Sequence, residues 1–281
     1  MDLARSKQAL QNMRGILNDQ TIDFFSGLWD VQETIVPLNW RASNPNIPWG
    51  EKPLFAQEAP QMTEDEFYAA LVPISTYIGG AVLEFSLAAE KIAGPNRPSI
   101  PTDALNGMFA NPSIVISIIA GRLGIPQESN AQTSLELAVV SALQPTAIAA
   151  AATFATPENT MYVSGCCPVC GSPSSLGTIK DAGEMNGGPK ELWCSFCDTT
   201  WTHPRIQCTR CGNNTQEDLT FSFEENDVNH RIYHCAKCHG THKIVDEKPL
   251  MEPFDRRATD IAMTPLEVAA IEALNASTPT K

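Results

Sequence analysis

Residues 191–212 read ELWCSFCDTTWTHPRIQCTRCG and contain two Cys-x-x-Cys pairs separated by ten residues. A similar pair lies on each side of this stretch. The pairs are Cys167 with Cys170, Cys194 with Cys197, Cys208 with Cys211, and Cys235 with Cys238. The fold of the C-terminal part depends on whether the two central pairs close around one metal ion or belong to two different sites.

Three pairings would each give two tetrahedral sites. The central pairs could close on each other and leave the outer pairs together, the pairs could alternate in a cross-brace, or they could close in order along the chain. Cys167 and Cys208 are 41 residues apart (208 − 167), and Cys194 and Cys235 are also 41 apart (235 − 194). A segment that begins at residue 167 therefore repeats at residue 208, as expected of a duplicated module. The repeat favours closure in order, although it does not strictly exclude the cross-brace.

The spacing within each pair suits a closed metal site. Two intervening residues let both sulfur atoms reach one ion from a single tight turn. Gly171 and Gly212 follow two of the pairs, and glycine permits the positive φ that turns backbone N–H groups toward the sulfur atoms. Four thiolates complete a tetrahedral site and leave no position for a reactive water, which argues against a metallohydrolase. They suit zinc and rubredoxin-type iron alike.

Cysteine and histidine are confined to the C-terminal part of the chain. All nine cysteines lie between Cys166 and Cys238, and all five histidines follow residue 200. In a reducing cytoplasm this spacing indicates metal ligands in place of disulfides. Eight paired cysteines suffice for two ions, so we expect Cys166 to be a bystander in preference to a spare ligand or reactive thiol. For the same reason His234 and His239 are expected at the surface or behind the ligands.

Composition limits the possible functions. The chain has 281 residues, 43% of them hydrophobic, and a formal net charge of −13. Residues 1–160 carry 8 basic and 16 acidic side chains, and residues 161–281 carry 11 and 16. Neither part has the excess of positive charge that nucleic-acid binding normally requires. We find no Gly-rich phosphate loop and no GxSxG or HExxH motif, so no catalytic arrangement is indicated and the protein is not expected to be an enzyme.

The first half has the pattern of helices joined by proline-rich connections. Thr63 and Glu66 have capping-box spacing, and apolar residues then recur at helical intervals. Residues 37–60 are expected to form a long loop over the helices, or alternatively a docking segment for a partner. Residues 137–156 are apolar but are interrupted at Pro145, so a buried pair of helices is favoured over a membrane span. With charges close to the N-terminus and no secretory signal expected, the protein is predicted to be cytoplasmic and not inserted in a membrane.

Together these patterns predict an α+β protein. Residues 1–160 would form a helical domain, and residues 161–248 would form tandem rubredoxin-like or zinc-ribbon-like four-cysteine modules, the first at 161–204 and the second at 205–248. Residues 249–281 would form a C-terminal helix and tail, with the helical pattern running from Met251 to Leu274. Residues 219–223 and 231–234 have strand patterns between the cysteine pairs of the second module.

The cysteine-rich segment resembles the FdhE-type formate dehydrogenase accessory proteins. The resemblance rests on CPVCGS at residues 167–172, LWCSFCDTTWTHPRIQCTRCG at residues 192–212 and CAKCHGTHK at residues 235–243. It is dense over about residues 160–245 and general over the helical half. At residue 242 the chain has histidine where the family pattern leads us to expect an aromatic residue.

The resemblance implies a cytoplasmic maturation factor or chaperone. Such a protein would bind the catalytic subunit of a molybdenum- or tungsten-dependent formate dehydrogenase through a surface shaped by two metal centres, with iron favoured by the resemblance and zinc as the alternative. Trp201 and Arg205, on the bridge between the two metal sites, are candidate partner contacts because Trp and Arg are common at interfaces, although they could equally pack the modules together. A double-rubredoxin-like electron carrier is the alternative function.

Overall fold

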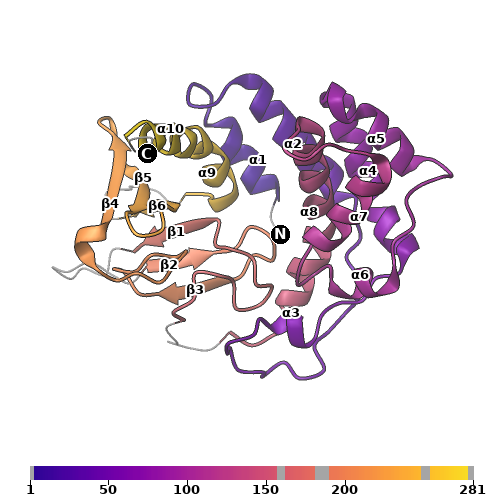
Figure 1. Ribbon diagram of the computed structural model, residues 1–281, viewed down its shortest axis with the longest axis horizontal. Coiled ribbons are helices and arrows are strands. Elements are labelled where there is room, and N and C mark those ends of the chain that lie inside the picture. The colour runs from indigo at the N-terminus through magenta and orange to yellow at the C-terminus, as the bar shows by residue number, and fades with distance from the viewer. Residues whose placement is uncertain (1–2, 157–161, 181–189, 248–253, 278–281) are drawn as a thin grey trace. The chain divides into compact units, whose positions relative to one another are not determined.

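The structure is a computed structural model that describes residues 3–156, 162–180, 190–247 and 254–277. Its chain divides into two compact units (Figure 1). The first contains Asn18–Thr156 together with Val169–Ser172, and the second contains the N-terminal residues up to Leu17 and most of the chain after residue 157. The predicted α+β class is confirmed, because helices fill the first unit whereas a sheet, two four-cysteine groups and C-terminal helices lie in the second half of the sequence.

The described part of the first unit is helical. Its helices are α2 (Asp19–Glu33), α3 (Leu54–Gln57), α4 (Glu64–Ala81), α5 (Leu83–Ala93), α6 (Thr102–Gly107), α7 (Ser113–Leu123) and α8 (Asn130–Ala151). The predicted capping box begins α4: Thr63 N donates to Glu66 Oε2 at 2.8 Å, and Glu66 N donates to Thr63 Oγ1 at 3.2 Å. Behind this cap, Phe67 and Leu71 are fully buried, as their helical spacing predicts. Trp40 anchors the 37–60 segment through its ring contact with Phe154, at 5.9 Å between centroids.

Helix α8 corrects the predicted break at Pro145. The sequence indicated two helices there, whereas the structure has one helix of 22 residues with Pro145 inside it. A proline within a helix leaves the carbonyl four residues earlier without its usual N–H donor. Here that carbonyl belongs to Ser141, and it accepts a 2.8 Å hydrogen bond from Nε2 of the buried Gln32 side chain on α2. This replacement donor, together with the burial of α8, allows the helix to continue.

By length and composition, α8 alone among the helices of the described chain is long and apolar enough to cross a membrane. However, 67% of its most apolar window is buried within the protein. Alanines on α8 such as Ala138, Ala142 and Ala147 have no exposed surface, so they pack against other helices of the unit. Burial of this kind is typical of the core helix of a globular protein.

The described strands of the second unit form a six-stranded sheet in the order β3-β2-β1-β6-β5-β4. The strands are β1 (Leu176–Ile179), β2 (Lys190–Trp193), β3 (Thr200–His203), β4 (Leu219–Glu224), β5 (Asp227–Cys235) and β6 (Thr241–Asp246), and a 3₁₀ turn (η1, Gln216–Asp218) precedes β4. The strands β4 and β5 contain the two segments predicted from the sequence. Within each module the three strands are antiparallel, whereas β1 and β6 pair in parallel and join the modules.

The 41-residue repeat is visible in this sheet. β3 begins at Thr200 and β6 at Thr241, 41 residues later, and each follows the second cysteine pair of its module. Leu192 faces Trp201 in the first module, and Tyr233 faces His242 at the equivalent positions of the second. The two modules are therefore structural copies whose edge strands have merged into one sheet.

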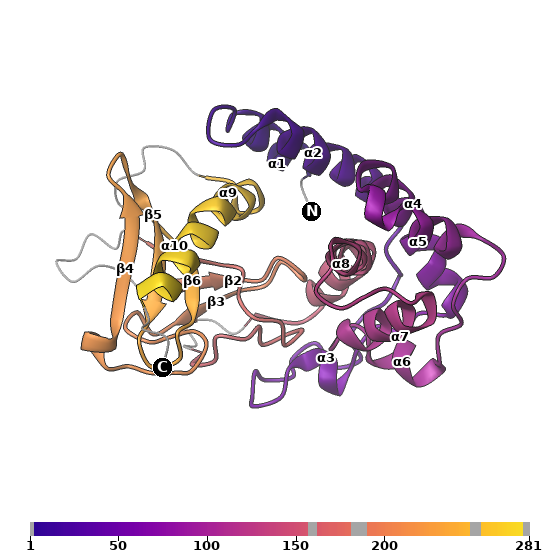
Figure 2. The same ribbon diagram turned by 45° about the horizontal axis from the view of Figure 1, so that its top comes forward.

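Helices cover one face of this sheet, as Figure 2 shows for α9 (Arg256–Ala262) and α10 (Thr264–Ser277). Met263, between these helices, is buried in a cluster with Leu176, Trp193, Ile232 and Val245 of the sheet. The predicted single helix from Met251 is thus two helices, and residues 251–253 lie outside the described residues. Helix α1 (Leu3–Gln11) also belongs to this unit, whereas the sequence placed residues 1–160 in one helical domain.

Candidate metal centres

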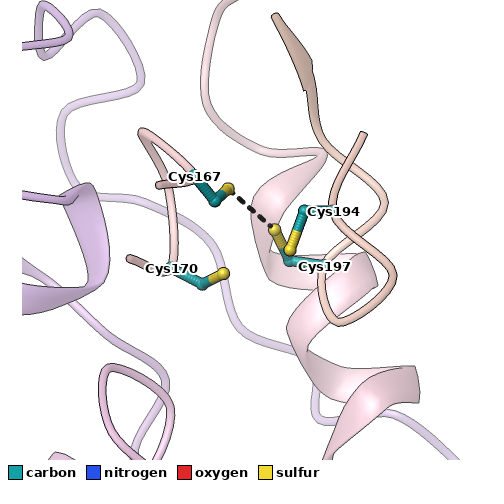
Figure 3. A group of neighbouring side chains, drawn as sticks. All are labelled: Cys167, Cys170, Cys194 and Cys197. Atoms are coloured by element: carbon teal, nitrogen blue, oxygen red, sulfur yellow. Dashed lines mark hydrogen bonds between the residues drawn. The ribbon is translucent and has the colours of Figure 1, made fainter. Parts of the chain in front are cut away.

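The first group of four cysteines is buried and compact. Figure 3 shows the sulfur atoms of Cys167, Cys170, Cys194 and Cys197 turned toward one another. All four lie within 4.8 Å of one another, and each residue is at most 2% exposed. The sulfur atoms of Cys167 and Cys197 are 3.4 Å apart. The first pair and the second pair of the chain therefore come together, as the repeat favours.

The second group has the same plan but lies nearer the surface. Its members are Cys208, Cys211, Cys235 and Cys238, whose sulfur atoms also lie within 4.8 Å of one another. The sulfur of Cys208 is 3.7 Å from that of Cys238, and the same distance separates Cys211 from Cys235. Cys235 is buried, whereas Cys211 is exposed. A bound ion would therefore be shielded in the first group and accessible in the second.

The sulfur separations fit a tetrahedral four-thiolate site. With metal–sulfur bonds of about 2.3 Å, tetrahedral geometry places neighbouring sulfurs about 3.8 Å apart. The closest pairs in the two groups, at 3.4 and 3.7 Å, are near this value. They are far from the roughly 2.05 Å of a disulfide bond. Both groups could therefore each hold a zinc or iron ion with all four positions filled by sulfur.

The backbone after the second cysteine of every pair turns through positive φ. The angles are +83° at Gly171, +64° at Asp198, +73° at Gly212 and +56° at His239. Two of these turns are recognisable in the sequence because they contain glycine. The other two contain Asp198 and His239, which do not predict a positive φ. Asp198 adopts the turn while its carboxylate accepts a 2.8 Å hydrogen bond from Nε1 of Trp193. Because all four pairs share this conformation, the modules also match at the level of backbone geometry.

Backbone N–H groups favour the thiolate of Cys235 in the second group. The N–H of Arg210 donates to the sulfur of Cys208 at 3.4 Å. Burial opposes ionisation of Cys235, but the backbone N–H groups of Cys238 and Lys237 and the neighbouring thiols outweigh it and lower the pKa of Cys235 to about 7. A metal ion needs its cysteine ligands deprotonated. The donors reduce the proton release at Cys235, whereas burial raises the pKa of Cys208 and raises that of Cys238 to about 12.

A buried lysine lies beside the second group. Lys190, on β2, is 2% exposed, and its Nζ donates to the carbonyl of Gln207, the residue before Cys208. Burial lowers the pKa of Lys190 to about 8, and the nearby Cys208 opposes this change. The amine therefore stays mostly protonated at pH 7. Its positive charge lies near a centre that would carry a net negative charge, because four thiolates outnumber the positive charges of a divalent or trivalent ion.

The other residues singled out in the sequence lie outside both four-cysteine groups. Cys166 is exposed, and His239 is exposed beside the fourth pair. The ring nitrogen Nε2 of His234 lies 2.8 Å from the hydroxyl of Ser222. Among the described residues, neither four-cysteine group contains a histidine.

The two candidate partner contacts differ in exposure. Trp201 is 2% exposed, and its indole N–H donates to the carbonyl of Ser164 at 3.1 Å, which suits the packing role. Arg205 is exposed and lies at the edge of a cavity beside the second group.

The fold and these groups define a class of protein: a helical unit combined with a sheet that is built from two duplicated four-cysteine modules. No family model matches the chain. A protein named FdhE homolog from Shewanella oneidensis is 36% identical over 88 residues, which are 31% of this chain and 28% of that protein. An FdhE homolog from Aquifex aeolicus is 34% identical over 90 residues, 32% of this chain and 31% of that protein. The matches thus span about a third of these relatives.

The fold is shared over a much longer part of the chain. The crystal structure of the FdhE protein from Pseudomonas aeruginosa aligns with a TM-score of 0.59 at 22% sequence identity. The alignment covers 97% of this chain and 92% of that one. The resemblance to FdhE-type proteins that the cysteine segments predicted is therefore confirmed, in sequence over part of the chain and in fold over nearly all of it.

Proposed function

We propose that the protein is a non-catalytic accessory factor that binds the catalytic subunit of a molybdenum- or tungsten-dependent formate dehydrogenase during maturation, in the cytoplasm. The observation that carries the proposal is the pair of four-cysteine groups. They lie on a fold that the chain shares with an FdhE protein. In this proposal the eight paired cysteines are metal ligands, and the expected domain boundaries are kept except that α1 belongs with the second unit and residues 169–172 with the first.

The geometry of the groups supports a structural role for the ions. Four sulfur atoms around one ion leave no place for a metal-bound water or substrate, so the ions would not act as Lewis acids toward a bound molecule. They would instead hold loops in fixed positions. Cys211 and His239 are exposed at the turns around the second group, so an ion there would shape part of the outer surface.

Small metal modules commonly depend on their ions for folding. In the second module, β4 exposes most of its side chains, including Phe221 and Phe223 at 47% and 44%. A strand with so little burial contributes little hydrophobic stabilisation. The metal-binding turns that begin at Cys208 and Cys235 would therefore have to hold the β4–β5 hairpin in place. Loss of the second ion should therefore alter the surface around β4 and β5 more than the buried core of the unit.

Affinity purification from the native host, grown anaerobically with formate, tests the proposal. Mass spectrometry should find a formate dehydrogenase catalytic subunit in stoichiometric amount with the wild-type chain. Serine replacement of Cys167 and Cys170 should abolish this recovery, whereas Cys166→Ser is the matched control and should leave it intact. If no such subunit is recovered while the enzyme is being made, the proposed function is wrong.

The exposure of the second group favours a second candidate, an electron carrier with two rubredoxin-like iron centres. An exposed iron site can exchange electrons with a partner at short range, and Cys211 is exposed. This function requires iron and reversible one-electron reduction at a useful rate. Zinc in both sites of the protein isolated from its host would exclude it. Rapid reduction without recovery of the enzyme subunit would favour it over the accessory role.

A further inference from the structure

A cavity of about 480 Å³ lies on the sheet face opposite α9 and α10, beside the second four-cysteine group. Tyr233 and Ile244 line it, and they point away from the face that carries Ile232 and Val245 because successive strand residues alternate sides. The loop of residues 205–209 forms another wall. The volume lies within the range of small-molecule sites, roughly 300 to 1,000 Å³.

The repeat explains why the cavity lies in the second module. At the equivalent position of the first module, the large indole of Trp201 is buried and donates to the carbonyl of Ser164. In the second module the residue 41 positions later is His242, and the residue 41 positions after Ser164 is Arg205. Both line the cavity. A smaller ring therefore occupies the place of a tryptophan, and an arginine lies at the rim.

Apart from the metal-ligand cysteines Cys208 and Cys235, the charged side chains of the lining are positive, although the chain as a whole is acidic. The charged residues among the described lining residues are Lys190 and Arg205, and that lining includes no aspartate or glutamate. The protein carries 32 acidic and 19 basic side chains, so a lining with two basic residues and no acidic residue differs from the composition of the chain as a whole. Lys190 and Arg205 attract an anion, whereas the thiolates of Cys208 and Cys235 in the same lining oppose it.

Two polar groups of this lining have unused hydrogen-bonding capacity. An ammonium group has three donors, and Lys190 uses one on the carbonyl of Gln207. No carboxylate pairs with Lys190 among the described residues. Nδ1 of His242 is inaccessible to solvent and has no hydrogen-bond partner in the described structure, while its Nε2 lies 2.7 Å from the hydroxyl of Ser174. Whether this nitrogen is a donor or an acceptor depends on the tautomer of the ring, so Lys190 is the group that offers donors to a ligand.

Aromatic rings form the other side of the cavity. Phe221 and Tyr233 are stacked, with ring centroids 5.4 Å apart and planes at 21°. Both line the cavity together with Leu219 and Ile206. Offset stacking on such rings favours a flat apolar group.

We propose that this cavity binds a small aromatic carboxylate, whose ring lies against Phe221 and Tyr233 and whose carboxylate is held by Lys190 and Arg205. This binding is independent of the proposed accessory function, because it requires no partner protein. It also requires no metal chemistry. The second group supplies only the wall that carries Cys208 and Cys235.

The test is titration of the metal-loaded protein with 4-phenylbutyrate and with its neutral amide, followed by calorimetry and ligand-observed NMR. The carboxylate should bind at least about tenfold more tightly than the amide, because ionic hydrogen bonds are roughly twice as strong as neutral ones. Arg205→Gln, at an exposed position, should remove most of this preference. Lys180→Gln is the control. Lys180 is exposed just after β1, pairs with Glu191 and does not line the cavity.

A second variant, Lys190→Met, keeps the buried stem and removes the charge, and its metal content should be measured alongside. Lost carboxylate binding with both ions retained supports the proposal. Equal binding of acid and amide, no binding of either at millimolar concentration, or unchanged binding in Arg205→Gln would each overturn it.

Discussion

Gly165 lies where the two modules approach each other, and replacing it with alanine gives a sharp test of the second four-cysteine group. A Cβ atom added at Gly165 would lie 1.7 Å from the carbonyl oxygen of Thr209, the residue after Cys208. Reaching an ordinary contact distance requires a movement of about 1.5 Å. Metal sites tolerate deviations of only about 0.2 Å in ligand distance. The strain falls on backbone atoms and cannot be relieved by rotating a side chain.

Overpacking of this kind costs about 1–3 kcal/mol, which corresponds to roughly 5- to 150-fold weaker binding of the second ion if the strain falls on that site. The first group should be weakened less, because Cys166 separates Gly165 from the nearest ligand, Cys167, whereas Thr209 directly follows Cys208. Competition with a chromophoric chelator measures both affinities in one titration. Gly121→Ala on α7 is the matched control, since a Cβ there meets no atom within 4 Å. Two ions bound with wild-type affinity in Gly165→Ala would refute the reasoning.

Further predictions concern removal of the ions, a buried ion pair and a turn with positive φ. Excess chelator should remove the two ions in two kinetic phases, with the exposed second group emptied first, and a single phase would contradict the difference in burial. Lys243→Met should destabilise the protein by about 2 kcal/mol in denaturant unfolding, because it leaves the largely buried Asp260 carboxylate unpaired, whereas Lys180→Met should cost less than about 1 kcal/mol. Burial raises the pKa of Asp260, and Lys243 opposes that rise. The loss of stability in Lys243→Met should therefore be largest above the pKa of Asp260 in the folded protein, and it should shrink as the pH falls through that pKa and the carboxylate is protonated. His239→Gly should raise stability by about 0.5 kcal/mol by relieving a φ of +56°, whereas His239→Ala should give no such gain.

The 41-residue repeat favoured the observed grouping of the cysteines without excluding the cross-brace. Cysteine pairs with two intervening residues form within one turn, and the 41-residue repeat relates one module to the next without any knowledge of distant contacts. The capping box of Thr63 and Glu66 was predictable for the same reason, since it spans only four residues. Turns with positive φ were predictable only where glycine marks them, and Asp198 and His239 adopt the same geometry without that signal.

Features that depend on contacts between distant residues were not predictable. The modules share a sheet because β1 pairs in parallel with β6, for example at Thr178 and Val245, and no local pattern encodes that pairing. Helix α8 continues through Pro145 because Gln32, from another helix, supplies a donor to Ser141. The cavity was hidden too, although the departure from an aromatic residue at His242 was visible in the sequence and lies at its wall.

The account rests on two closed four-thiolate centres, and X-ray absorption spectroscopy of the protein isolated from its host tests this most directly when combined with elemental analysis. We predict two ions per chain, each with four sulfur neighbours at about 2.3 Å and no nitrogen or oxygen ligand. The same spectra distinguish iron from zinc. A single ion per chain, or a nitrogen or oxygen atom in the first coordination shell, would contradict the account.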